Sequence, residues 1–156
     1  MNEELQFWDS AKTFSFTQRK MPLNVFLRPM FRISLLCLTL FLCCRNMQGS
    51  FLRIQFFNWI TKNRDNYKEN IKEFNLRHIL KNEFLHLDPF LNIAIQFASA
   101  EGLIFVSDKK RIVLTEKGKA FCDFILKEEL FVDETAFLKN LKSIPDKVVV
   151  RHIKES

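Results

Sequence analysis

The segment from Asp88 to Glu129 constrains the fold more than any other part of the chain, because its residues mark where each element begins and ends. It opens with Asp88-Pro89, a combination typical of a helix start, where aspartate caps the helix and proline takes the first position. The predicted helix covers about Phe90–Glu101. It ends at Gly102, the residue type preferred just past the end of a helix.

The residues that follow predict a β-hairpin and then another helix. The hairpin strands are Leu103–Ser107 and Arg111–Leu114, joined by the polar turn Asp108–Lys110, and Thr115 caps a helix over about Glu116–Glu129. This order predicts a mainly α fold with a small two-stranded β wing, that is, a winged helix-turn-helix domain. Because a two-stranded ribbon is not stable alone, we expect the wing to pack on the helices. Its packing residues would be Ile104, Val106, Ile112 and Leu114.

The amino-acid sequence of the wing also resembles that of known proteins. The sequence Gly102-Leu103-Ile104, a short basic turn and then Arg111–Phe121 (RIVLTEKGKAF) closely resembles the wing of many bacterial winged-helix proteins. Winged helices serve both as DNA readers and as protein-docking modules, so the fold does not choose between these functions.

The apolar run Ile33–Cys44 (ISLLCLTLFLCC) is the second strong constraint. At about 12 residues it is shorter than the ~20 that a membrane-spanning helix needs. It begins more than 30 residues into the chain and is followed by Arg45–Gln48, which does not form a cleavage site for a signal peptide. We therefore expect a central core helix over about Met30–Cys44, ended by Asn46–Gly49, in a cytoplasmic protein.

The remaining helices are predicted from caps and apolar spacing. Ser50 is a suitable N-cap for a helix that reaches about Lys62. Its apolar face comprises Phe51, Ile54, Phe56, Phe57 and Ile60. Polar residues are expected outside this face or at its margins: Arg53, Gln55 and Asn58. Tyr67–Leu87 is predicted to form two short helices, and another short helix should run from Asp133 to Leu141.

Composition shapes the expectations for partners. The chain has 156 residues, a net charge of +6, and 18 Phe against 1 Tyr. Phenylalanine has no polar group, so this excess belongs in a core or a dry interface. The positive charge permits nucleic acid or an acidic partner, and it equally serves solubility. The predicted divisions are an aromatic-rich arm over 1–29, a winged-helix domain over 30–130, and a C-terminal helix and tail over 131–156.

Catalytic and metal-binding patterns are missing from the sequence. The cysteines form no CxxC pair and are interpreted as buried, reduced thiols, and the dispersed histidines give no ligand set. No nucleotide-binding or metalloprotease motif occurs. We therefore expect no enzyme activity, no metal and no cofactor. The cysteines are Cys37, Cys43, Cys44 and Cys122, and the histidines are His78, His86 and His152.

Nucleic-acid binding is the alternative with residues to support it. The wing and its flank hold cations that can contact phosphates or simply be solvated: Lys109, Lys110, Arg111, Lys117 and Lys119. The predicted helix in the recognition position presents Asn92, Gln96 and Ser99, but no Arg or Lys occurs from Asp88 to Glu101. Because recognition helices normally combine base-reading groups with phosphate-binding cations, sequence-specific DNA reading is disfavoured.

Two short motifs resemble a known family. Arg28-Pro29 followed by Met30–Leu36, and Ser50–Arg53 leading to Asn58-Trp59, are similar to the middle component of bacterial three-component ABC systems, which overlap the Lamassu-type antiphage systems. The resemblance covers about Asn24–Leu130. It implies an accessory subunit whose partners are an SMC-like ATPase and an effector, often a nuclease. No catalytic residue is carried over.

The aromatic residues of the arm are the predicted partner anchors, since a free arm would rarely carry so many large apolar groups. They are Phe7, Trp8, Phe14 and Phe16. The arm should pack on its own domain or on a partner. Trp59 is a further anchor or, alternatively, a core residue. The accessory role in antiviral defence is the leading hypothesis, with weak, non-specific DNA contact by the wing. A DNA-binding winged-helix transcription regulator is the alternative.

Overall fold

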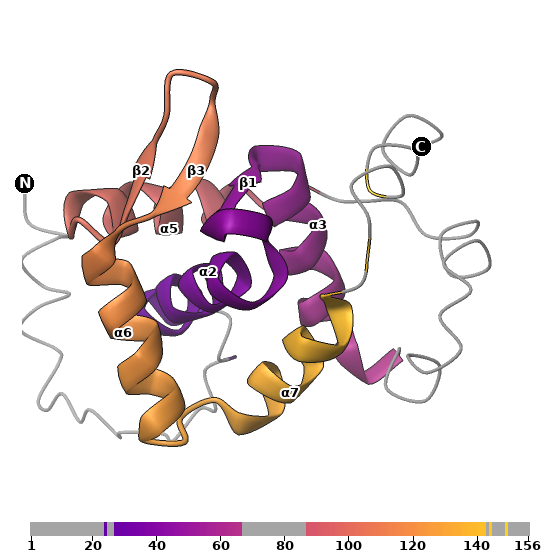
Figure 1. Cartoon of the computed structure of the whole chain (residues 1–156). Helices are drawn as coiled ribbons and strands as arrows, with labels where there is room; N and C mark the ends of the chain where they lie inside the picture. The colour runs from indigo at the N-terminus through magenta and orange to yellow at the C-terminus, as the bar shows by residue number, and fades with distance from the viewer. Residues whose placement is uncertain (1–23, 25–26, 67–86, 143, 145–148, 150–156) are drawn as a thin grey trace, which may run out of the picture.

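The computed structural model describes residues 24, 27–66, 87–142, 144 and 149 (Figure 1). The described elements are mainly helical, with a small three-stranded antiparallel sheet. In chain order they are α2 (Pro29–Cys43), η2 (Arg45–Met47), β1 (Gln48–Ser50), α3 (Phe51–Lys62), η3 (Arg64–Asn66), α5 (Pro89–Ala100), β2 (Ile104–Val106), β3 (Arg111–Leu114), α6 (Glu116–Lys127) and α7 (Val132–Leu141).

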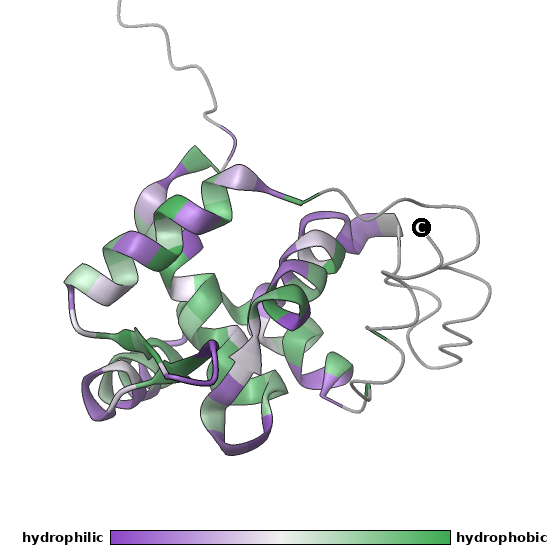
Figure 2. Ribbon diagram, turned by 90° about the horizontal axis from the view of Figure 1, so that it is seen from above, coloured by the Kyte–Doolittle hydropathy of each residue, from purple (hydrophilic) through white to green (hydrophobic). Residues whose placement is uncertain are grey.

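Helix α2 is the centre of the fold, as the apolar run predicts. It contacts α3, α5, α6 and α7, which surround it in Figure 1. Its residues are buried from Phe31 to Leu40, and the hydropathy colouring of Figure 2 is green through most of the helix. Helix α2 has 15 residues, and no helix in the described part of the chain has the length and hydrophobicity to cross a membrane.

The predicted hairpin is confirmed, and the structure adds a strand to it. β2 pairs with β3 in antiparallel register, with Ile104 opposite Leu114. β1 pairs with the other edge of β3, with Gly49 opposite Ile112, so the two-stranded prediction was wrong. Sequence reasoning assigned Gln48 and Gly49 of β1 to the end of one helix and Ser50 to the cap of the next, and it predicted no strand there.

The hairpin packs on the helices through fewer residues than predicted. Ile104, Ile112 and Leu114 are buried, whereas Val106 is 56% exposed. Val106 is the last residue of β2, next to the turn, and Figure 1 shows the hairpin projecting away from the helical body. Distance from the helices therefore leaves this side chain in solvent.

Helix α3 begins as predicted, because the Ser50 side chain accepts a hydrogen bond from the Arg53 N–H at 3.2 Å. The predicted exposure of its polar residues was wrong, since Arg53, Gln55 and Asn58 are all buried. The guanidinium of Arg53 donates to the carbonyl oxygens of Cys43 and Ile144, at 3.0 and 3.2 Å. Gln55 and Asn58 hydrogen-bond to Asp88, so all three of these polar residues have partners outside α3.

The other predicted helices in the described residues agree with the structure to within two residues at each end; the largest difference is in α6, which stops at Lys127 instead of Glu129. Thr115 caps α6 through its hydroxyl, which accepts the Gly118 N–H at 3.0 Å. The two short helices predicted for Tyr67–Leu87 lie almost entirely outside the described residues. The arm up to residue 23 and most of the tail also lie outside them.

Helix α6 packs closely on the hairpin at Gly118, and this contact is testable. A Cβ at this position would overlap the carbonyl oxygen of Leu103 and lie 2.6 Å from Leu114 Cδ1. We expect Gly118→Ala to lower the free energy of unfolding by about 1–3 kcal/mol, as overpacking does, despite the better helix propensity of alanine. Denaturant unfolding measures the change. Asp123→Ala on the exposed face is the control, and a Gly118→Ala protein as stable as wild type would contradict the packing.

Candidate functional site

The start of α5 is fixed by the carboxylate of Asp88. One oxygen, Oδ1, accepts the Phe90 N–H at 3.0 Å and caps the helix. The other, Oδ2, accepts Arg32 Nη1 at 2.9 Å and Asn58 Nδ2 at 3.3 Å. Only 7% of the Arg32 side chain and 10% of the Asp88 side chain are exposed. One carboxylate therefore joins α2, α3 and α5.

The backbone of Asp88 is held as firmly as its side chain. Its N–H donates to Gln55 Oε1 at 3.0 Å, and its carbonyl oxygen accepts Gln55 Nε2 at 3.3 Å. Burial alone would raise the pKa of the Asp88 carboxyl. The hydrogen bonds from Arg32, the Phe90 N–H and Asn58, with the charge of Arg32, outweigh burial and hold this pKa below its ordinary value.

The Asp88 network orients α5 so that two apolar stripes lie on different faces. Facing the core are the smaller residues of the helix: Leu91, Ala94 and Ala98. Facing solvent are Phe90, Ile93 and Phe97, which are 52%, 45% and 50% exposed. The predicted polar residues Asn92, Gln96 and Ser99 are exposed beside them. The solvent face of α5 is therefore a mixed surface with a strong apolar component.

Sequence reasoning missed this apolar stripe, although a signal for it was present. Phe90, Ile93 and Phe97 are spaced i, i+3 and i+7, and so are Leu91, Ala94 and Ala98. Both sets match a helix face that packs on a core. A helix that packs on one core needs only one apolar stripe. The second stripe in the sequence of this helix therefore indicates that the helix has a second apolar surface.

A shallow apolar groove lies between α5 and the N-terminal end of α2. We name it the α2–α5 groove, and its hollow is about 80 Å³. Its lining residues are Leu27, Pro29, Arg32, Phe90, Ile93, Ala94 and Phe97. The guanidinium carbon of Arg32 lies 5.4 Å from the centre of the Phe90 ring, so the cation stacks on the aromatic residue while it binds Asp88.

The structure divides the cations predicted to contact nucleic acid into separate groups. Lys109 and Lys110 are exposed in the turn of the hairpin, which is hydrophilic in Figure 2. Lys117 and Lys119 lie in the first turn of α6, at the opposite end of the hairpin. Lys117 donates to the carbonyl oxygen of Glu101 at 2.6 Å, and Lys119 forms an ion pair with Glu116.

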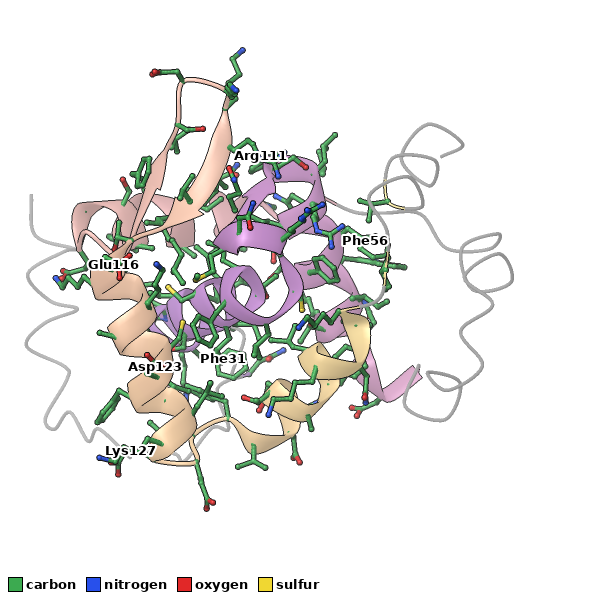
Figure 3. The ribbon with its side chains drawn as sticks, viewed as in Figure 1. Phe31, Phe56, Arg111, Glu116, Asp123 and Lys127 are labelled. Carbon is green, nitrogen blue, oxygen red and sulfur yellow. The ribbon has the colours of Figure 1, made fainter. Side chains whose placement is uncertain are left out.

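Arg111 belongs to neither pair of lysines, because its side chain is hydrogen-bonded to β1. Its Nη2 donates to the carbonyl oxygen of Gln48 at 3.3 Å, which ties β3 to β1, and Figure 3 shows this residue at the β1 side of the sheet. Lys109 and Lys110 are therefore the residues of the predicted set that are best placed to reach phosphates.

The predicted partner anchors have different outcomes. Phe7, Trp8, Phe14 and Phe16 lie outside the described residues. Trp59 is 7% exposed and belongs to the hydrophobic core, with its ring centre 6.2 Å from that of Phe56. This supports the core interpretation of Trp59. Helix α3, which carries Trp59, is buried along most of its length.

The four cysteines are buried, as predicted. Burial raises the pKa of Cys37 and of Cys43 to about 12, and it also raises the pKa of Cys122. Cys43 Sγ donates to the Leu138 carbonyl oxygen at 3.1 Å, which joins α2 to α7. Among the described residues, no group of three or more His, Cys, Asp and Glu side chains is placed to hold a metal ion.

Comparisons of this chain with protein-family models, with curated proteins and with solved structures found no match.

The charge of Asp88 predicts a dependence of stability on pH. Asp88→Asn keeps the shape of the cap but removes the negative charge that the buried guanidinium of Arg32 binds, and breaking a buried ion pair from one side typically costs about 3–5 kcal/mol. Because the folded pKa of Asp88 is lowered, its stabilisation is complete above pH ~4, the unfolded value, and is lost as pH falls through the folded value. The stability gap between wild type and variant should therefore narrow in acid.

Urea unfolding at pH 7 and at progressively lower pH measures that gap. Asp123→Asn on the exposed face of α6 is the control for removing a carboxylate. A gap between wild type and Asp88→Asn that stays constant down to the lowest pH would show that the charge does not stabilise the start of α5.

Proposed function

We propose that this chain is a non-catalytic accessory subunit of an antiphage complex that contains an SMC-like ATPase and an effector, and that it acts through protein–protein contacts in the cytoplasm. Its described core would be a winged-helix domain in which β1 adds a third strand to the wing. The two short motifs that resemble the middle component of Lamassu-type systems support this assignment.

The observation that carries the proposal is the chemistry of the exposed face of α5. A helix in the recognition position of a DNA reader presents polar and cationic side chains. Helix α5 instead exposes Phe90, Ile93 and Phe97, and it has neither lysine nor arginine. Exposed apolar patches on soluble proteins usually mark surfaces for a protein partner.

The size of a stable interface indicates how this face would be used. A standard interface covers about 800 Å² on each partner, contributed by roughly 20–30 residues. Helix α5 has 12 residues, so it supplies the centre of such an interface rather than the whole of it. The beginning of α2, where Leu27 and Met30 are exposed, extends the apolar surface on one side.

A charge placed on the apolar stripe tests this proposal. Ile93→Asp should weaken binding of the ATPase by roughly 30-fold, the equivalent of a hot-spot loss of about 2 kcal/mol. Gln96→Asp is the matched control, because it adds the same charge to an exposed position of the same helix and should retain binding. The measurement is recovery of a coiled-coil ATPase with the tagged chain from native lysate, identified by mass spectrometry and followed by a titration.

Two results would contradict different parts of the proposal. Equal recovery of the ATPase by wild type and by Ile93→Asp would show that the interface does not use the exposed face of α5. A monodisperse monomer at high concentration with no ATPase recovered from native lysate would contradict the accessory role itself. Circular dichroism of each variant confirms that a loss of binding is not a loss of folding.

The runner-up is a winged-helix regulator that binds DNA, and the exposed Lys109 and Lys110 favour it. A phosphate contact contributes about −0.9 to the slope of log affinity against log salt. If both lysines touch phosphates, Lys109→Glu with Lys110→Glu should weaken DNA binding and reduce that slope by about 2. Lys139→Glu on the exposed side of α7 is the control.

We expect the purified chain to bind DNA weakly and without sequence preference. Electrophoretic mobility shifts across a series of salt concentrations measure both the affinity and the slope. A nanomolar, sequence-specific site for the purified chain would make the regulator the correct assignment.

A further inference from the structure

The α2–α5 groove has the dimensions and chemistry of a site for apolar side chains. Its hollow of about 80 Å³ is well below the 300–1,000 Å³ of most small-molecule sites. Among the described residues that line it, Arg32 is the only charged one, and its guanidinium is already bound to Asp88 and stacked on Phe90. A polar ligand would therefore find no available charge, whereas an apolar side chain would find apolar walls.

The chain itself enters the described structure at the rim of this groove. Leu27 lines the groove, and its N–H donates to the carbonyl oxygen of Asn24 at 2.8 Å. Residues 1–23 are therefore joined to the domain directly beside the groove. This part of the arm carries four large aromatic residues: Phe7, Trp8, Phe14 and Phe16.

The length of the arm is sufficient for it to occupy the groove of its own chain. Phe16 stands 11 residues before Leu27, and an extended chain spans about 3.3–3.6 Å per residue, so its reach is roughly 36–40 Å. Helix α5 has 12 residues and is about 18 Å long. Phe14 and Phe16 can thus reach every point of the groove. A covalently attached segment also has a high effective concentration there.

We propose that the arm docks in the α2–α5 groove of the same chain, with Phe14 and Phe16 against Phe90, Ile93 and Phe97. In the isolated protein the arm then covers the apolar face of α5. On assembly a partner would take its place. The docking concerns the isolated chain and does not rest on the proposed function.

Protection of an engineered thiol tests the docking in the full-length chain. Ile93→Cys places a thiol in the groove, and the four native cysteines are buried, so they give little background labelling. We expect Cys introduced at 93 to react with a thiol reagent at least ten-fold more slowly than Cys introduced by Asn92→Cys, which lies on the neighbouring exposed polar face. The rates should not depend on protein concentration.

Adding Phe14→Asp and Phe16→Asp to the Ile93→Cys chain should abolish the protection and leave labelling of the Asn92→Cys chain unchanged. Removal of residues 1–20 is a second route to the same result. Equal labelling of Ile93→Cys chains with and without the aspartates would overturn the proposal. Protection that grows with protein concentration would also overturn it, because the occupant would then be a second copy of the chain. The ATPase-binding experiment is independent, so failure of the docking is distinguishable from failure of the accessory role.

Discussion

The carboxylate of Asp88 is the interaction on which the arrangement of the helices depends. It caps α5 and at the same time binds Arg32 on α2 and Asn58 on α3, while Gln55 fixes the backbone of the same residue. A buried ion pair of this kind adds little net stability over apolar packing, because both charges must lose water. Its stronger effect is on geometry. Because the carboxylate keeps its hydrogen bonds to Arg32, Asn58 and the Phe90 N–H only when α5 begins at this point, the network fixes where α5 begins.

That fixed start explains how α5 can keep a large apolar stripe in solvent. The two stripes of the helix are offset by one residue, or about 100° of rotation. Turning the helix to bury the larger stripe would move it away from its cap and from Arg32. The core-facing stripe is also adapted to its position, because two alanines allow α5 to approach α2 closely. The inward residues are Leu91, Ala94 and Ala98, and the outward residues are Phe90, Ile93 and Phe97.

Features encoded by neighbouring residues could be predicted from the sequence, and features made by distant partners could not. The caps Ser50, Asp88 and Thr115 act within three residues of themselves, so their helices were predictable. β1 is three residues long and exists only through pairing with β3, more than 60 positions away. The burial of Arg53 likewise depends on the carbonyl oxygen of Ile144, 91 positions away. The exposed stripe of α5 was missed for the related reason that apolar spacing alone does not say which stripe a tertiary contact selects.

The described surface separates two kinds of chemistry, and this separation predicts how the two proposed contacts would differ in their dependence on salt. The exposed cations at the hairpin turn, Lys109 and Lys110, lie at the far end of the hairpin from the α6 lysines, whose contacts are made within the domain. The apolar stripe lies on α5, which has no cation. Contacts at the hairpin turn would weaken as salt rises, because counterions compete for phosphates. Contacts at α5 would not weaken in this way, because burial of apolar surface does not depend on charge screening. If a protein partner binds the α5 face and a polyanion binds the hairpin turn, as proposed, the two contacts would therefore respond differently to ionic strength, and a salt titration of one preparation would distinguish them.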